Sequence, residues 1–220
     1  MRLLFASFVC LASALLVSAA ENVTGTDSLA GASREAVAGR TDAALKILDD
    51  AEKRGDSSGL LLAKRGCIHL EQGKTEEALS DFHTAHEKDP TLYLPRLRLG
   101  DVYFRQKKWD EARAAYLELM GDTNVLVLNE RLRYGILMTH LAAKDDDGAK
   151  PAFDRVVFPT ETPAYYYAQA AWAFAHGSQK AGEKWMKTAD GIFDASQTAW
   201  FARPLFDLGW IKTKPPIVLD

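Results

Sequence analysis

The feature that most constrains the fold of this chain is a residue pattern that recurs at a fixed step of 34 positions. One set of small and aromatic residues is followed 34 positions later by residues of the same character: Gly66, Ala78, Phe82 and Ala85 become Gly100, Ala112, Tyr116 and Leu119. The same shift backwards also keeps the character: Gly73, Ala78, Phe82 and Ala85 become Gly39, Ala44, Leu48 and Ala51. A gapless step of this length predicts an array in which each unit is completed by stacking on its neighbour.

Each unit has the pattern of two amphipathic helices joined by a short turn. In the clearest unit we predict these helices over 60–72 and 75–87. Gly66 stands in the middle of the first helix, where glycine costs ~1 kcal/mol relative to alanine. We therefore expect the backbone of another helix to approach closely there. Ala78 is the small residue expected to face it, with the ring of Phe82 wedged beside the contact.

These residues resemble the tetratricopeptide repeat family. The family's Leu-Gly-x-x-Tyr pattern is met at 99–103, and its small, aromatic, small and proline positions are met by Ala78, Phe82, Ala85 and Pro90. The family's aromatic residue earlier in the first helix is absent, since Leu62 and Arg96 stand there. The resemblance covers about 59–126 and, through the second helix only, 25–58.

We therefore predict an all-α protein, a right-handed α-solenoid of about five helical hairpins with a C-terminal capping helix. The repeat array is expected over 21–195, with units near 25–58, 59–92, 93–126, 127–162 and 163–195. Past residue 126 the spacing changes, because Ala149 and Phe153 restate the small and aromatic positions three residues late. The aromatic-rich segment at 196–220 is predicted to cover the last hairpin as a helix and a non-helical tail, because an open repeat end needs a cap.

The N-terminus carries the pattern of a secretory signal peptide, which we predict at 1–20. Arg2 precedes an apolar run over 3–17, and Ser18 and Ala20 stand at the −3 and −1 positions of a cut after Ala20. An uncleaved anchor is the alternative, but the run is shorter than the ~20 residues that span a bilayer. We expect an exported protein, periplasmic or secreted, with no stable membrane insertion after cleavage.

Charge and cysteine content exclude several classes of function. The formal net charge of −3 and the lack of a basic run argue against a nucleic-acid partner or an anionic membrane. Cys10 lies in the predicted signal, so Cys67 is left without an intramolecular disulfide partner and is expected to be a small buried residue. No phosphate-binding glycine loop, zinc-protease helix or nucleophile motif occurs. We predict no enzymatic activity and no cofactor.

Two polar clusters are considered as metal sites. His83 and His86 lie one turn apart on a predicted helix, but zinc normally takes at least three protein ligands. The acidic run at 145–147 lacks the alternating spacing and closing glutamate of a calcium loop. A solvated helix face and a polar turn are the favoured interpretations. An enzyme or metal-binding protein on a solenoid scaffold is thus the least favoured function.

The resemblance implies a concave face, lined by the first helices of successive units, that receives a peptide or a protein segment. The inward positions carried over from the family are Leu60, Ala63, Cys67, Leu94, Leu97, Asp101, Phe104 and Arg105. The implied function is a non-enzymatic interaction or scaffold module with a protein or peptide partner. The alternative is a permanent accessory subunit of a cell-envelope complex, and the sequence leaves the oligomeric state open. A carboxylate clamp found in some family members is not expected, because Ala63 and Cys67 replace its Lys and Asn.

Overall fold

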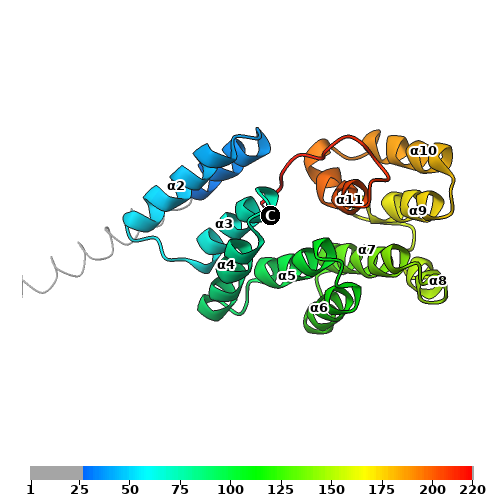
Figure 1. Ribbon diagram of the computed structural model, residues 1–220, viewed down its shortest axis with the longest axis horizontal. Coiled ribbons are helices and arrows are strands. Elements are labelled where there is room, and N and C mark those ends of the chain that lie inside the picture. The colour runs from blue at the N-terminus through cyan, green and yellow to red at the C-terminus, as the bar shows by residue number, and fades with distance from the viewer. Residues whose placement is uncertain (1–26, 220) are drawn as a thin grey trace, which may run out of the picture.

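The computed structural model describes residues 27–219, and within this range the chain consists of helices and their connections (Figure 1). A helical stretch at 27–37 is followed by α2 (Thr41–Lys53), α3 (Gly59–Glu71), α4 (Thr75–Lys88), α5 (Tyr93–Arg105), α6 (Trp109–Asp122), α7 (Leu126–Ala143), α8 (Asp146–Asp154), α9 (Ala164–Ala175), α10 (Gln179–Asp190) and α11 (Ala195–Asp207). The predicted signal segment at 1–20 lies outside the described residues. No helix within 27–219 is long and apolar enough to cross a membrane.

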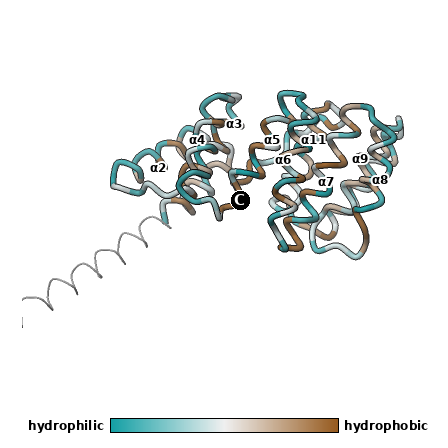
Figure 2. Tube along the Cα trace, turned by 90° about the horizontal axis from the view of Figure 1, so that it is seen from below, coloured by the Kyte–Doolittle hydropathy of each residue, from teal (hydrophilic) through white to brown (hydrophobic). Residues whose placement is uncertain are grey.

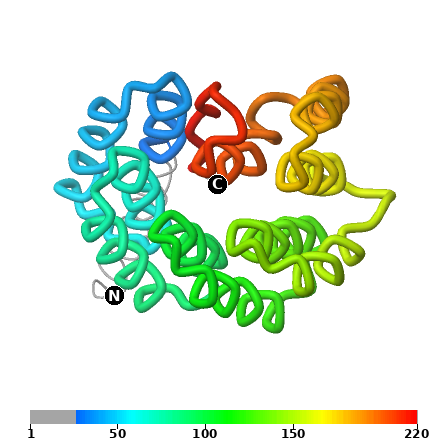
Figure 3. The backbone as a smooth tube through the Cα atoms, turned by 45° about the vertical axis from the view of Figure 1, so that its right-hand side comes forward, coloured from blue at the N-terminus to red at the C-terminus, as the bar shows by residue number. Residues whose placement is uncertain are grey.

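Consecutive helices pair as hairpins, and the hairpins follow a curved path (Figure 3). The pairs α3 with α4, α9 with α10 and α5 with α6 make the most extensive contacts, whereas α7 contacts α6 of the preceding hairpin more extensively than it contacts its own partner α8. Apolar residues recur along each helix between polar ones, as amphipathic packing requires (Figure 2). The predicted all-α solenoid of helical hairpins with a C-terminal helix is confirmed.

The mid-helix glycines make the predicted close approaches, but with aromatic rings. A Cβ on Gly66 would lie 2.7 Å from Cε1 of Phe82, and a Cβ on Gly100 would overlap the ring of Tyr116. The expectation that another backbone comes closest to Gly66 is therefore wrong, because the nearest atoms belong to the Phe82 ring, which was expected only beside the contact. Glycine is required here because the ring occupies the space of a side chain.

We expect Gly100→Ala to lower the free energy of unfolding by up to about 2 kcal/mol, which is the overpacking cost less the gain in helix propensity. The added methyl group must displace the buried Tyr116 ring, and overpacking of this kind costs about 1–3 kcal/mol. The gain in helix propensity offsets ~1 kcal/mol. Gly121→Ala is the control, because nothing lies within 4 Å of a Cβ at that helical position. Urea denaturation should show the control unchanged or stabilised; equal behaviour of both variants would contradict the steric argument.

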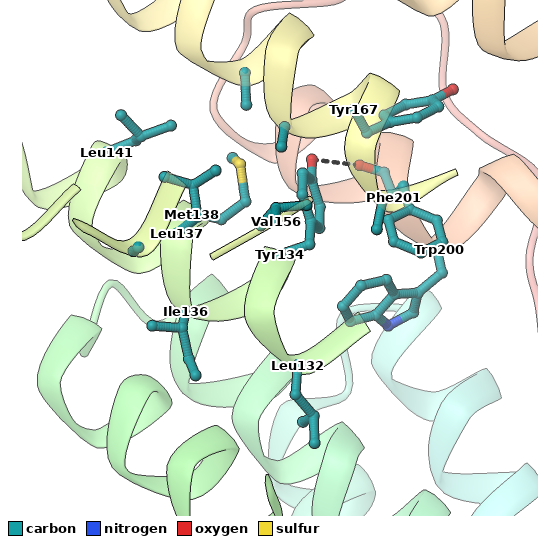
Figure 4. Packing of buried hydrophobic residues seen from close by; sticks show 14 of the residues in the cluster. Leu132, Tyr134, Ile136, Leu137, Met138, Leu141, Val156, Tyr167, Trp200 and Phe201 are labelled. Atoms are coloured by element: carbon teal, nitrogen blue, oxygen red, sulfur yellow. Dashed lines mark hydrogen bonds between the residues drawn. The ribbon is translucent and has the colours of Figure 1, made fainter. Parts of the chain in front are cut away.

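The C-terminal helix α11 does not continue the curved array but lies inside it (Figure 3). Tyr134 on α7 is fully buried and donates a hydrogen bond of 2.8 Å to the backbone oxygen of Phe201 on α11 (Figure 4). The ring of Trp200 meets the Tyr134 ring edge-on, with centroids 6.1 Å apart. These contacts hold α11 against α7, which is the first helix of its hairpin. Because the first helices line the concave face, α11 lies on that face.

Candidate functional site

The first helices of the two central hairpins carry matching stripes of side chains. The stripes are Lys64, Cys67 and Glu71 on α3, and Arg98, Asp101 and Arg105 on α5. Each residue of the first stripe stands 34 positions before its counterpart in the second. Within a stripe the spacing of three and four residues places all members on one helix face. Apart from Cys67, the two faces therefore present charged side chains at equivalent positions along the helices.

Helix α11 supplies the opposite wall of this site. Trp200 Nε1 donates a hydrogen bond of 3.1 Å to Asp101 Oδ2, and Arg203 lies 2.9 Å from the Glu71 carboxylate. Between the walls remains a cavity of about 30 Å³, which is the scale of a water molecule. The concave face is therefore filled at this level by the protein's own C-terminal helix.

The C-terminal tail, residues 212–219, ends beside α3 (Figure 1) and is hydrogen-bonded to side chains of both α3 and α5. Pro215, Ile217 and Leu219 are buried, whereas Pro216 is exposed. This alternation is that of an extended chain with one side against a surface. Ile217 and Leu219 join the hydrophobic core formed by the N-terminal hairpins, where they are 8% and 2% exposed.

Two long basic side chains bind the backbone of the tail. Lys64 Nζ donates to the carbonyl oxygen of Leu219 at 3.0 Å, and Arg98 Nη2 donates to the carbonyl oxygen of Val218 at 3.0 Å. Lys64 and Arg98 are equivalent positions of consecutive repeats. The repeat step thus places two cations so that they meet consecutive carbonyl groups of one extended segment.

Glu71 is the electrostatic centre of the site. Its side chain is 9% exposed and lies 2.6 Å from Arg105, 2.9 Å from Arg203 and 3.7 Å from Lys214 of the tail. Burial alone would raise the pKa of Glu71, but the attraction of Arg105 and Arg203 outweighs it and holds that pKa below its usual value. The carboxylate is therefore charged at neutral pH and joins α3, α5, α11 and the tail.

Asp207 on α11 forms a second ion pair with Arg105, with 3.3 Å between Asp207 Oδ2 and Arg105 Nε. Burial raises the pKa of Asp207, and the nearby Arg105 and Arg203 offset this only in part. Burial likewise raises the pKa of the Cys67 thiol, which is consistent with a small buried residue rather than a reactive thiolate.

The carboxylate of Asp101 accepts hydrogen bonds from side chains of the protein itself. It accepts hydrogen bonds from the Tyr116 hydroxyl at 2.7 Å, from Arg98 at 3.0 Å and from Trp200 at 3.1 Å. Burial, together with the Asp101 charge, raises the pKa of Tyr116 well above its usual value, so the hydroxyl remains a donor. A partner would have to displace α11 to reach this carboxylate.

The structure brings together only part of the predicted concave-face set. Four of the predicted residues line the cavity beside α11: Cys67, Asp101, Phe104 and Arg105. Ala63 and Leu97 are completely buried and Leu94 nearly so, and these three offer no surface to a partner. Leu60 is half-buried against the N-terminal core.

Lys64, Glu71 and Arg98 were not among the site residues predicted from the sequence. The step of 34 could have revealed them, since Arg98 and Arg105 are the equivalents of Lys64 and Glu71. Nothing local indicated that the tail would lie on this face. Among the side chains that the structure describes, no group of three or more His, Cys, Asp or Glu is arranged to hold a metal ion.

Comparisons with known proteins agree with this architecture. Residues 69–124 match the tetratricopeptide repeat family. The chain is 30% identical over 112 residues to the tetratricopeptide repeat and J domain-containing co-chaperone DNJ1 of Fusarium oxysporum f. sp. lycopersici. That match covers 51% of this chain and 21% of the relative, so the chain spans about a fifth of the relative's length.

Two crystal structures share the fold. A tetratricopeptide repeat protein from Parabacteroides merdae aligns with a TM-score of 0.53 and 16% identity, over 85% of this chain and 74% of that one. A thermophilic protein of the same class from Thermus thermophilus aligns with a TM-score of 0.62 and 18% identity, over 83% and 99%. Residues 69–124 thus match the tetratricopeptide repeat family, and the two crystal structures show that the chain shares the helical-hairpin fold of tetratricopeptide repeat proteins.

Proposed function

We propose that this protein is a scaffold whose concave face, between α3 and α5, binds an extended segment of a partner protein. The observation that carries the proposal is the tail, which lies extended on that face with its carbonyl groups held by Lys64 and Arg98. Contacts to backbone carbonyls do not depend on the side chains of the bound segment. The same positions therefore suit another chain in extended form.

The tail also indicates the chemistry of the partner segment. Its buried positions are apolar and alternate with exposed ones, and Lys214 faces the carboxylate of Glu71. A matching partner carries a basic residue followed by alternating aliphatic residues. Because the tail is covalently attached, its effective concentration is high, and a partner must compete with it for the face.

A peptide with the sequence of residues 212–220 tests the proposal. In full-length protein carrying Ile217→Asp and Leu219→Asp, the tail should leave the face, because two carboxylates cannot replace buried aliphatic side chains. The labelled peptide should then bind at least about tenfold more tightly than it binds the wild type, whose face is occupied. Fluorescence anisotropy measures both affinities.

Two controls separate recognition from general unfolding. A peptide with Asp at its Ile and Leu positions should not bind, and adding Lys64→Ala and Arg98→Ala to the released protein should weaken the binding. Far-UV circular dichroism should show all variants to be helical. If the helical, released protein binds the peptide no better than the wild type does, the tail is only a folding element and the proposal fails.

A further inference from the structure

The fourth hairpin has helices of unequal length, unlike its neighbours. Helix α7 has 18 residues and α8 has nine, whereas α5 and α6 have 13 and 14. At 1.5 Å per residue, α7 is about 27 Å long and α8 about 14 Å. The N-terminal half of α7 therefore has no second helix beside it where α8 has ended. A loop at 155–162 covers part of this region instead and is hydrogen-bonded to Glu130 of α7.

Two adjoining hollows mark the place of the missing turns. The larger, about 410 Å³, is lined by apolar residues of three helices and by two arginines: Met120, Ile136, Ala152, Val157, Arg133 and Arg155. The smaller, about 180 Å³, shares Arg133, Arg155 and Val157 and extends to Leu126. We call these hollows together the α7 groove. Neither is lined by the tail or by α11, so the α7 groove is separate from the concave face.

Large apolar side chains are exposed at the α7 groove. Leu126 and Val157 in its lining are 56% and 57% exposed, and the neighbouring Phe158 is 64% exposed. Val125 and Val127 beside them are also exposed. Contiguous apolar surface of this kind is typical of interaction sites on soluble proteins.

The charges at the α7 groove favour an acidic partner. Arg133 and Arg155 have no carboxylate partner among residues 27–219. The Glu130 carboxylate, which also lines the smaller hollow, is occupied by hydrogen bonds from Thr160 and Thr162. Glu161 is the remaining acidic residue of the lining and borders only the smaller hollow.

Acidic residues on the neighbouring helices are already paired with other bases. Glu118 and Asp122 of α6 bind Arg96, and Asp154 of α8 binds Lys150. The larger hollow thus combines an apolar floor with two arginines and no acid of its own.

We propose that the α7 groove is a second docking surface, which binds an amphipathic helix of a partner protein with carboxylates beside its apolar stripe. The partner helix takes the place of the missing turns of α8 and completes the hairpin with α7. Its apolar side chains cover Ile136 and Val157, and its carboxylates meet Arg133 and Arg155. A helix laid in an apolar groove is a general mode of recognition.

A designed pair of helical peptides tests this surface on the full-length protein. Both carry leucine at i, i+3, i+4 and i+7, and the flanking positions are glutamate in one peptide and lysine in the other. The glutamate peptide should bind the wild type at least about tenfold more tightly, because only its charges complement the arginines. Arg133→Glu with Arg155→Glu should reverse the preference, as measured by fluorescence anisotropy.

A matched pair of surface variants locates the binding. Val157→Asp should abolish binding of the glutamate peptide, while Ile192→Asp should leave it unchanged, because Ile192 is similarly exposed (58%) but lies between α10 and α11. Equal binding of both peptides to the wild type, or full affinity of Val157→Asp, would overturn the proposal. So would sedimentation showing a dimer that Val157→Asp dissociates, since the occupant would then be a second copy of this chain.

Discussion

Glu71→Gln is expected to lower the free energy of unfolding at pH 7 by about 3 kcal/mol, as the loss of one partner from a buried ion pair does. The substitution keeps the shape of the side chain but removes the charge between Arg105 and Arg203. Two largely buried guanidinium groups then lose their shared carboxylate, and Lys214 of the tail loses its partner.

The effect of Glu71→Gln should depend on pH in a defined direction. The pKa of Glu71 is lower in the folded protein than its usual 4.5. Its stabilising contribution is therefore complete above the unfolded-state pKa and is lost as the pH falls through the folded-state pKa. The difference between wild type and variant in urea denaturation should be constant above ~pH 5 and shrink towards zero in more acidic solution.

Glu118→Gln is the matched control for this carboxylate. Glu118 also contacts an arginine, Arg96, but its side chain is 76% exposed. An exposed pair of this kind contributes less than about 1 kcal/mol. A Glu71→Gln difference that stayed the same at every pH would show that packing, and not charge, had been lost.

Glu130→Ala is the second substitution with a large expected effect, about 3 kcal/mol. The Glu130 carboxylate accepts hydrogen bonds from both Thr160 and Thr162 hydroxyls at 2.7 Å and from the backbone N–H groups of Glu161 and Thr162. Hydrogen bonds to a charged group contribute about 1.5–3 kcal/mol each. In the variant, the loop at 155–162 can move into water, where its donor groups form new hydrogen bonds. The expected loss of stability is therefore smaller than the sum of the individual hydrogen-bond contributions.

Hydrogen exchange should show where the effect of Glu130→Ala falls. The amides of Glu161 and Thr162 should lose protection first, because their acceptor is gone. Glu161→Ala is the control, since Glu161 bonds to Glu130 through its backbone N–H, which the substitution keeps. Unchanged protection at these two amides in Glu130→Ala would mean that the loop is held by its other contacts.

Much of the fold followed from the sequence because helical repeats are encoded locally. The step of 34, the mid-helix glycines and the aromatic residues opposite them specify a hairpin and its stacking on the next one. Gly66 and Gly100 do allow a close approach, but the contacting group is an aromatic ring and not the backbone that we expected. The export signal at 1–20 remains a prediction, since it lies outside the described residues.

The site was only partly accessible from the sequence. Cys67, Asp101 and Arg105 were named from family positions, whereas Lys64, Glu71 and Arg98 are charged and suggest a solvated helix face. They are half-buried or buried only because α11 and the tail cover them.

The sequence by itself therefore determined the helices, their pairing and the repeating core, because these depend on contacts between neighbours in the chain. Only the tertiary structure decided that the array curves far enough for Leu219 to reach Lys64, 155 positions away. The curvature is the sum of small rotations between successive hairpins, and no local pattern records that sum. The occupied concave face follows from this curvature, and the α7 groove follows from the unequal hairpin that interrupts the repeat.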